Sequence, residues 1–378
     1  MISKDNLRFF GAVSVLVGTC IGAGVLGIPY VAAQSGFFTA LGYIFVLGFI
    51  ILFLNLYLGE VALRTNGDHQ LIGYAKKYLG KKWKYVVEFA TIFGLFAALV
   101  AYMLGVGESL SFLIFGNNSY ELWFGIIFGI FMAFLIRGGL KSLKKFEKIG
   151  VLVVLSLLVV VFAVFIGKVD FSNLLGFSSL NVLLPFGVIL FALMSFHAIP
   201  EVRLVLKKKE KLFKKTMITG TIISVVFYIL FTLVVVGFSG DKTPQVSTLA
   251  LGSVFIFLGM FTMFTSYLAG GNALMENFIL DERWNKNWSW FLASIIPIGL
   301  FFLIHFTDFF SFTNILSIGG VISGGILAVA ILFMIKKAKK KGDRKPEYSM
   351  PIKWWVVGLL ALFFILGVVR EILLAVRG

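Results

Sequence analysis

The sequence has few of the residues from which most catalytic and metal centres are built. Its 378 residues include one cysteine, Cys20, three histidines and 18 acidic residues. A single cysteine excludes an intrachain disulfide and any thiolate cluster around zinc or iron–sulfur. The one adjacent acidic pair, Asp281 and Glu282, is flanked by Arg283 and is better suited to capping a helix than to holding a metal at the membrane surface. A membrane-embedded enzyme is therefore disfavoured, and no metal site or cofactor is expected.

Apolar residues, in contrast, make up 59% of the chain, with 43 phenylalanines and a mean hydropathy of +0.99. Such a composition does not fit one soluble core inside a polar surface. A membrane-spanning helix needs roughly 20 mostly apolar residues. The sequence therefore predicts an all-α polytopic membrane protein with one transmembrane domain over residues 1–378. Eleven runs qualify as spans: 8–33, 36–63, 84–114, 121–138, 147–167, 182–206, 213–238, 246–280, 287–306, 309–335 and 353–376.

The positive charge of the chain is distributed unevenly between the predicted loops. A net charge of +16 can indicate a nucleic-acid partner. With the N-terminus placed in the cytoplasm, however, 30 of the 34 Lys and Arg residues fall on the cytoplasmic side and only Lys168, Lys242, Arg370 and Arg377 on the other. This asymmetry is typical of membrane topology. It predicts a cytoplasmic N-terminus, an external C-terminus and the lipid bilayer, rather than nucleic acid, as the partner of the basic loops. Between the second and third spans, residues 69–84 have apolar residues at helical spacing and predict a short interfacial helix.

The first span contains an unusual run, GTCIGAGVLGIP over residues 18–29. Its GxGxxG pattern matches a dinucleotide-binding fingerprint, but no strand precedes it and no acid follows about 20 residues later. Two interpretations remain open. The glycines can form a small-residue face for helix packing. They can also let the helix unwind at mid-membrane depth, where a half-helix N-terminus favours an anion and free carbonyls favour a cation.

The sixth span has a comparable interruption. Ser195 and His197 precede Pro200 there, much as the glycines precede Pro29 in the first span. Interruptions in the first span of each set of five predict two repeats of opposite orientation, at about 8–168 and 182–335, with a further helix at about 353–376. Such inverted repeats are the basis of alternating-access transport. A channel is disfavoured because two broken helices at one midplane site suit binding and release better than a continuous pore.

The same residues resemble a known family. GTCIGAGVLGIPY is similar to the first-helix signature of permeases of the amino acid/polyamine/organocation superfamily, most of all to the amino acid/auxin permeases and the bacterial aromatic amino acid permeases. Further similar stretches are LGEVALR at 58–64, SFHAIPE at 195–201 and FTSYL at 264–268. The resemblance implies the leucine-transporter fold, with broken helices 1 and 6. It implies secondary transport of neutral amino acids, and the apolar sixth-span residues favour large or aromatic ones. The expected location is a prokaryotic plasma membrane.

The resemblance also implies a substrate site. The substrate carboxylate would meet the backbone amides of Ala23 and Gly24, and Tyr102 would close over the bound molecule. For Tyr102 an ordinary interhelical hydrogen bond is the alternative, and for Met194 and Phe196 it is core packing. The implied substrate-binding residues are Thr19, Cys20, Gly22, Ala23, Gly24, Tyr102, Leu193, Met194, Ser195 and Phe196.

The coupling cation is either Na⁺ or H⁺, and the two alternatives use different residues. In sodium-driven members of the superfamily, first-helix carbonyls and eighth-helix hydroxyls hold the ion, which here implies Gly18, Ile21, Thr262, Thr265 and Ser266. The three hydroxyls share one helical face and suit a hard cation, although such groups often bond to their own helix backbone instead. Proton coupling needs a titratable group, for which His197 with Glu201 one turn later is the candidate. Glu60, Glu88 and Glu276 lie toward basic loops, where structural ion pairs are expected. Protein partners and exchange versus symport are left open.

Overall fold

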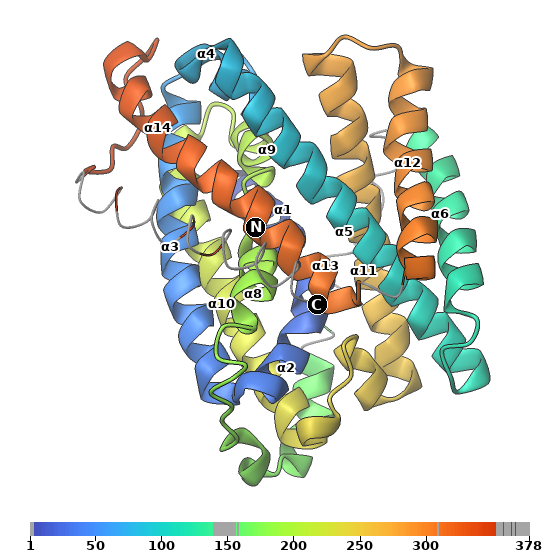
Figure 1. Cartoon of the computed structure of the whole chain (residues 1–378). Helices are drawn as coiled ribbons and strands as arrows, with labels where there is room; N and C mark the ends of the chain where they lie inside the picture. Colours follow the sequence, from blue (N-terminus) through green and yellow to red (C-terminus); the bar gives the residue numbers. More distant parts are fainter. Residues whose placement is uncertain are drawn as a thin grey trace.

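The computed structural model describes residues 4–138, 159–307 and 310–352, together with the single residues 156, 358, 364 and 367. Apart from these single residues, the predicted eleventh span lies outside the described residues, and so do residues 147–155 and 157–158 of the fifth. Within the described ranges the secondary structure is helical throughout, without a β-strand (Figure 1). The main helices are α1 Lys4–Cys20, α2 Ala23–Ser35, α3 Phe37–Leu63, α4 Leu71–Leu79, α5 Lys81–Phe115, α6 Glu121–Arg137, α8 Pro185–Leu193, α9 Ala198–Val205, α10 Phe213–Ser239, α11 Ser253–Glu276, α12 Lys286–Thr307, α13 Phe312–Gly319 and α14 Gly325–Lys341.

Helix length and apolarity identify the chain as an integral membrane protein. Seven described segments are long and apolar enough to cross a bilayer, and an eighth is obtained when α1 and α2 are taken as one bent span. Five of the seven coincide with single helices, namely α3, α5, α10, α11 and α12, while the others join α8 to α9 and α13 to α14. α6 has 17 residues, which gives about 25 Å, slightly less than the roughly 30 Å of a hydrocarbon core.

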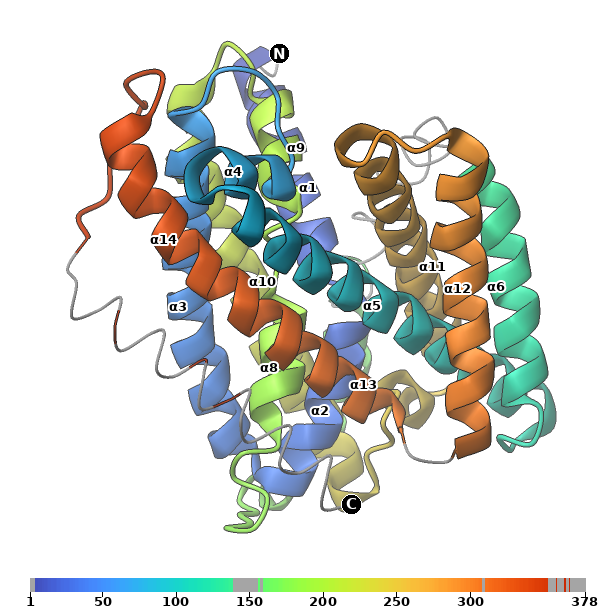
Figure 2. The same ribbon diagram turned by 45° about the horizontal axis from the view of Figure 1, so that its top comes forward.

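The helices form two groups, and two further helices run obliquely. α1, α2, α3, α8, α9 and α10 lie on one side, and α6, α11 and α12 on the other (Figure 2). α5 and α14 contact each other and run obliquely across the molecule (Figures 1 and 2). Near the middle of the α13–α14 segment, a π-helical turn at Gly320–Gly324 packs against α8. A Cβ on Gly320 would lie 2.4 Å from the Gly187 carbonyl oxygen, so only glycine allows this approach.

Glycines end several helices at points where the chain turns sharply. Gly36, with φ of +103°, separates α2 from α3, and a Cβ there would lie 2.4 Å from the Gly176 carbonyl oxygen. Gly80, with φ of +93°, separates α4 from α5. Such φ values favour glycine because a Cβ is strained there. The short helix predicted within 69–84 is thus confirmed as α4. The last residues of that range, from Lys81 on, belong to α5.

Segments that the charge pattern assigns to the cytoplasm meet at one end of the molecule, here called the basic end. Lys209 pairs with Asp5 at 2.7 Å, and the Arg8 side chain donates to the Lys207 carbonyl oxygen at 2.8 Å. Arg203 donates to the carbonyl oxygens of Thr65 and Gly67. These contacts fix the start of α1 and the end of α9 relative to the α3–α4 loop. That the basic end faces the cytoplasm stays a prediction.

A segment after α14, residues 343–351, lies across the basic ends of α3 and α14; we call it the strap. Its anchor is Glu60 on α3, which is fully buried. The Glu60 carboxylate accepts from Ser349 Oγ at 2.9 Å and from the Met350 amide at 2.7 Å, and it pairs with Arg64 and Lys339. Glu60 therefore has a structural ion-pair role, as expected, and Glu88 likewise pairs with Lys84 at 3.7 Å.

Candidate functional site

The first span is interrupted near its middle. α1 ends at Cys20, α2 begins at Ala23, and the two helices meet at an angle of 51°. Gly22 precedes α2 with non-helical φ of −121° and ψ of −141°. A Cβ on Gly22 would lie 2.8 Å from the Tyr102 hydroxyl and 2.9 Å from Ser266 Oγ. The absence of a side chain at this point lets two polar groups approach the backbone.

The sixth predicted span contains a second non-helical segment beside the first. α8 ends at Leu193 and α9 begins at Ala198, so residues 194–197 belong to neither helix. α2 packs directly on α8, because a Cβ on Gly24 would lie only 2.6 Å from Ala192 Cα. Pro200 lies in the first turn of α9, where a missing N–H costs no helical hydrogen bond. Beside the two interruptions, α2 and α8 therefore meet backbone to backbone.

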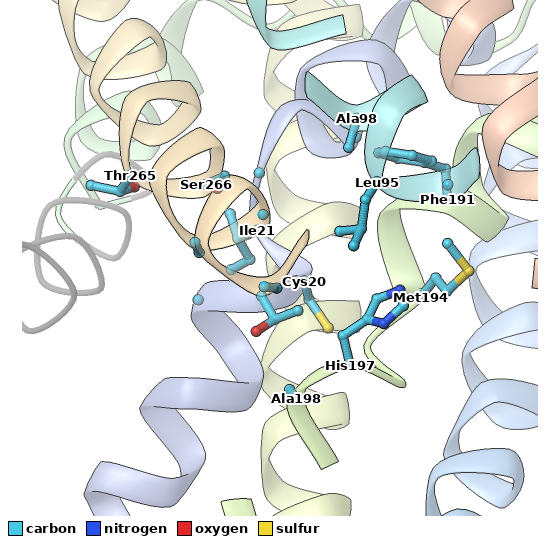
Figure 3. A pocket seen from close by; sticks show the side chains of 18 of the residues that line it. Cys20, Ile21, Leu95, Ala98, Phe191, Met194, His197, Ala198, Thr265 and Ser266 are labelled. Atoms are coloured by element: carbon cyan, nitrogen blue, oxygen red, sulfur yellow. The ribbon is translucent and has the colours of Figure 1, made fainter. Parts of the chain in front are cut away.

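A cavity of about 140 Å³ borders both interruptions. Its apolar part is formed by Leu95 and Ala98 of α5 and by Phe191 and Met194 at the end of α8 (Figure 3). Cys20, from the end of α1, and His197, from the second interruption, also line it. The volume is below the roughly 300 Å³ of typical small-molecule pockets, so the cavity has room for at most one small molecule.

The cavity extends from the interruptions toward the basic end. Val15 of α1, Glu201 of α9 and Ala273 of α11 line it, and each lies in the part of its helix that leads to that end. Thr19, at the cavity border, is exposed. On the other side of the break, Tyr102 and Ser266 close around Gly22.

The side chain of Tyr102, from α5, lies at the N-terminus of α2. Its hydroxyl interacts with the Ser266 side chain and with the backbone N–H of Ala23. No side chain of the preceding residues caps α2. Because a helix N-terminus presents unpaired N–H groups and partial positive charge, it attracts anions such as a carboxylate. An anion bound here would share or replace the Tyr102 hydroxyl.

A sequence model of the tryptophan/tyrosine permease family matches residues 5–246. The chain belongs to this family.

Three curated relatives of the chain are bacterial proteins named for the transport of amino acids. It is 27% identical over 228 residues to the "Tyrosine-specific transport system 1" of Haemophilus influenzae, covering 59% of this chain and 56% of that protein. It is 25% identical over 380 residues to the "Glutamine transporter 2" of Aliivibrio fischeri, covering 94% of this chain and 96% of the relative. It is 24% identical over 246 residues to the "Tryptophan-specific transport protein" of Shigella flexneri, covering 62% and 59%. The matches to the tyrosine and tryptophan relatives thus span little more than half of those proteins.

The permease brings most of its predicted substrate residues to one cavity, although their contact with a substrate stays a prediction. Thr19, Cys20, Gly22, Gly24, Tyr102 and Met194 line the cavity. Four others are buried and do not line it, namely Ala23, Leu193, Ser195 and Phe196. Of these, Ser195 accepts a hydrogen bond from Asn55 of α3 at 2.9 Å. Sequence reasoning missed Leu95, Ala98 and Phe191. The first two lie seven and four residues before Tyr102, a helical spacing that places them on its face.

Most of the residues predicted to bind the coupling cation also line the cavity, and one does not. Gly18, Ile21, Thr265 and Ser266 line the cavity, whereas Thr262 is fully buried and does not. The hydroxyls of Thr262 and Thr265 donate to carbonyl oxygens of their own helix, at 2.7 and 3.0 Å. Their oxygen lone pairs stay available to a cation. His197 and Glu201 also line the cavity, so groups for both coupling alternatives are present.

Proposed function

We propose that this permease is a secondary active transporter of large neutral amino acids, aromatic ones first, that works by alternating access. The observation that carries the proposal is the arrangement of the cavity. At one end lies the N-terminus of α2, where the Ala23 amide meets the Tyr102 hydroxyl, and at the other lie the apolar side chains of Leu95, Phe191 and Met194. An anion-binding end beside an apolar pocket matches the carboxylate and side chain of such an amino acid. The names of the tyrosine and tryptophan relatives favour the same class.

The proposed architecture is the leucine-transporter fold of the amino acid/polyamine/organocation superfamily, with the amino acid/auxin permeases as the nearest group. In this proposal residues 8–168 and 182–335 are inverted repeats and 353–376 is an additional helix, all within one domain in a prokaryotic plasma membrane. Support comes from the position of the two interruptions, in the first span of each repeat, and from their direct contact at Gly24 and Ala192. The cavity would be the site to which each side of the membrane gains access in turn.

In the proposed binding mode, the carboxylate accepts hydrogen bonds from the amides of Ala23 and Gly24. The Tyr102 hydroxyl, which now contacts the Ala23 amide, moves to the carboxylate and closes the site on the side away from the basic end. The amino acid side chain lies against Leu95 and Phe191. Glutamine, the substrate named for a third relative, would fit this apolar wall less well.

Coupling to a cation is proposed in two forms that experiment can separate. Na⁺ would be held by carbonyls of Gly18 and Ile21 with the hydroxyls of Thr265 and Ser266. H⁺ would bind at His197 or Glu201, which line the route toward the basic end. An exchanger or facilitator that uses neither gradient is the third possibility.

Uptake into proteoliposomes tests the function. The panel contains radiolabelled tryptophan, tyrosine, phenylalanine, glutamine and alanine, each with an inward Na⁺ gradient, an inward H⁺ gradient or neither. We expect gradient-driven accumulation of the aromatic amino acids and weaker accumulation of glutamine. Exchange without accumulation would replace symport by antiport. Folded protein that neither accumulates nor exchanges any member of the panel would overturn the substrate class.

A further inference from the structure

A single tyrosine outside the cavity contacts both interruptions. The hydroxyl of Tyr228, on α10, is 2.7 Å from the carbonyl oxygen of Cys20 and 2.7 Å from that of Ala192. Cys20 is the last residue of α1, and Ala192 is the next-to-last residue of α8. Carbonyls in the last turn of a helix have no amide partner within the helix. Tyr228 therefore serves the two helix ends at once.

The hydroxyl of Tyr228 restrains the positions of these two backbone carbonyls. A phenol has one proton, so it donates to one carbonyl at a time while the second oxygen stays at the same distance. Tyr228 is fully buried, and the ring of Phe227 packs edge-on to it. Without this donor, the buried Ala192 carbonyl would lose its hydrogen bond, and the Cys20 carbonyl would keep only that from the Gly22 amide, 3.1 Å away; a buried carbonyl without a partner is unfavourable. The Tyr228 hydroxyl thus stabilises the ends of both α1 and α8.

On one side, the two interruptions are held by contacts with α3 and α10. On the other side, they border the cavity. Asn55 of α3 donates to Ser195 within the second interruption. α10 also approaches α1 closely, since a Cβ on Gly220 would lie 2.5 Å from Leu16. Tyr228 itself does not line the cavity. Any effect it has on a bound molecule must therefore act through the backbone at Cys20 and Ala192.

We propose that Tyr228 is a positioning residue for transport. Its hydroxyl holds the ends of α1 and α8 in register, so that the cavity-lining groups of both interruptions move as one unit during the cycle. The proposal rests on the proposed function, because the unit matters for transport only if the cavity binds the substrate. It adds a residue that resemblance and cavity lining both leave out.

The test compares two buried tyrosines in the full-length protein. Tyr228→Phe removes the shared hydroxyl. Tyr267→Phe is the matched control, because Tyr267 is equally buried and its hydroxyl has only a weak contact, 3.9 Å from Met103 Sδ. Two quantities are measured in each variant: the KM for tryptophan uptake, and the rate at which N-ethylmaleimide labels Cys20, the sole cysteine, with and without tryptophan.

For Tyr228→Phe we expect the KM and the tryptophan concentration that half-protects Cys20 to rise roughly fivefold, the factor given by one net hydrogen bond. Cys20 should also be labelled faster, because the end of α1 is released. Tyr267→Phe should match the wild type. A general loss of stability would not change Cys20 labelling at equal folded fraction, so this readout separates positioning from folding.

A second pair of variants keeps the test decisive if the phenylalanine variant does not fold. Position 228 is replaced by 4-aminophenylalanine, which has N–H donors, or by 4-methylphenylalanine, which has the same size and none. The amino variant should restore wild-type KM and labelling, and the methyl variant should not. Equal behaviour of donor and non-donor variants would overturn the proposal while wild-type uptake upholds the proposed function. If the wild type transports nothing, the proposed function fails, and the unprotected labelling rate still tests whether Tyr228 fixes the break.

Discussion

Replacement of Gly24 by alanine is the sharpest test of the contact between the two interruptions. A Cβ at this position would lie 2.6 Å from Ala192 Cα and 2.7 Å from Ala192 Cβ. Ordinary contact begins at 3.4 Å, so α2 and α8 must separate by about 0.8 Å (3.4 minus 2.6). The obstacle is backbone and cannot rotate away. Because a misplacement of about 1 Å at a reacting or binding centre costs on the order of 100-fold in rate, we expect tryptophan uptake to fall tenfold to 100-fold. The larger Gly24→Leu change should abolish it.

The controls for this prediction are helical glycines that have open space around them. Gly42 in α3 and Gly299 in α12 have no atom within 4 Å of an added Cβ, so Gly42→Ala and Gly299→Ala should transport normally. Gly22→Ala should be intermediate, because its closest neighbours are the side-chain oxygens of Tyr102 and Ser266, which can adjust. Membrane insertion and thermal stability are measured for all four variants. Uptake by Gly24→Ala equal to that of Gly299→Ala would refute the reasoning.

Three further predictions follow from burial and contacts. Glu60→Gln removes one member of a buried ion pair and should destabilise the detergent-solubilised protein by about 3 kcal/mol. Glu88→Gln removes a longer ion pair, 3.7 Å from Lys84, and should cost about 1 kcal/mol or less; equal melting temperatures would contradict the anchor role of Glu60. Ala98→Leu narrows the apolar part of the cavity and should raise the KM for tryptophan more than that for alanine, so an equal change in both would remove Ala98 from the side-chain pocket. Alkylation of Cys20 should block uptake, and substrate should protect against it; unprotected labelling with full activity would place Cys20 outside the pathway.

The sequence could predict the helix ends near the site because closely spaced glycines weaken a helix, although it left close helix packing open as the alternative use of these residues. The run from Gly18 to Gly24 lies where α1 ends and α2 begins, and Tyr102 lies beside it. The second interruption was harder to interpret. Residues 194–197 have no regular period, so which side chains face the cavity depends on tertiary contacts; Met194 and His197 do, and Ser195 instead bonds with Asn55.

Other features depend on packing that a single sequence does not encode locally. The π-helical turn at Gly320–Gly324 is set by close approach to Gly187 and Phe191 on α8, about 130 residues earlier. The role of Tyr228 requires knowing that α10 passes behind both interruptions. Leu95 and Ala98, in contrast, could have been predicted from the sequence, since their helical spacing from Tyr102 identifies them without any structure.

The buried carboxylate of Glu60 also has consequences for how the protein is made. Its partners Lys339, Ser349 and Met350 are encoded up to 290 residues later. At 5–20 residues per second, the ribosome needs roughly 15–60 s to synthesise that interval. During this time α3 is already in the membrane, with Arg64 as the only partner of Glu60 that has been synthesised. Completion of the strap therefore marks a late step of assembly. Chains that stop before residue 349 lack two of these contacts and keep an incompletely paired acid at the end of α3.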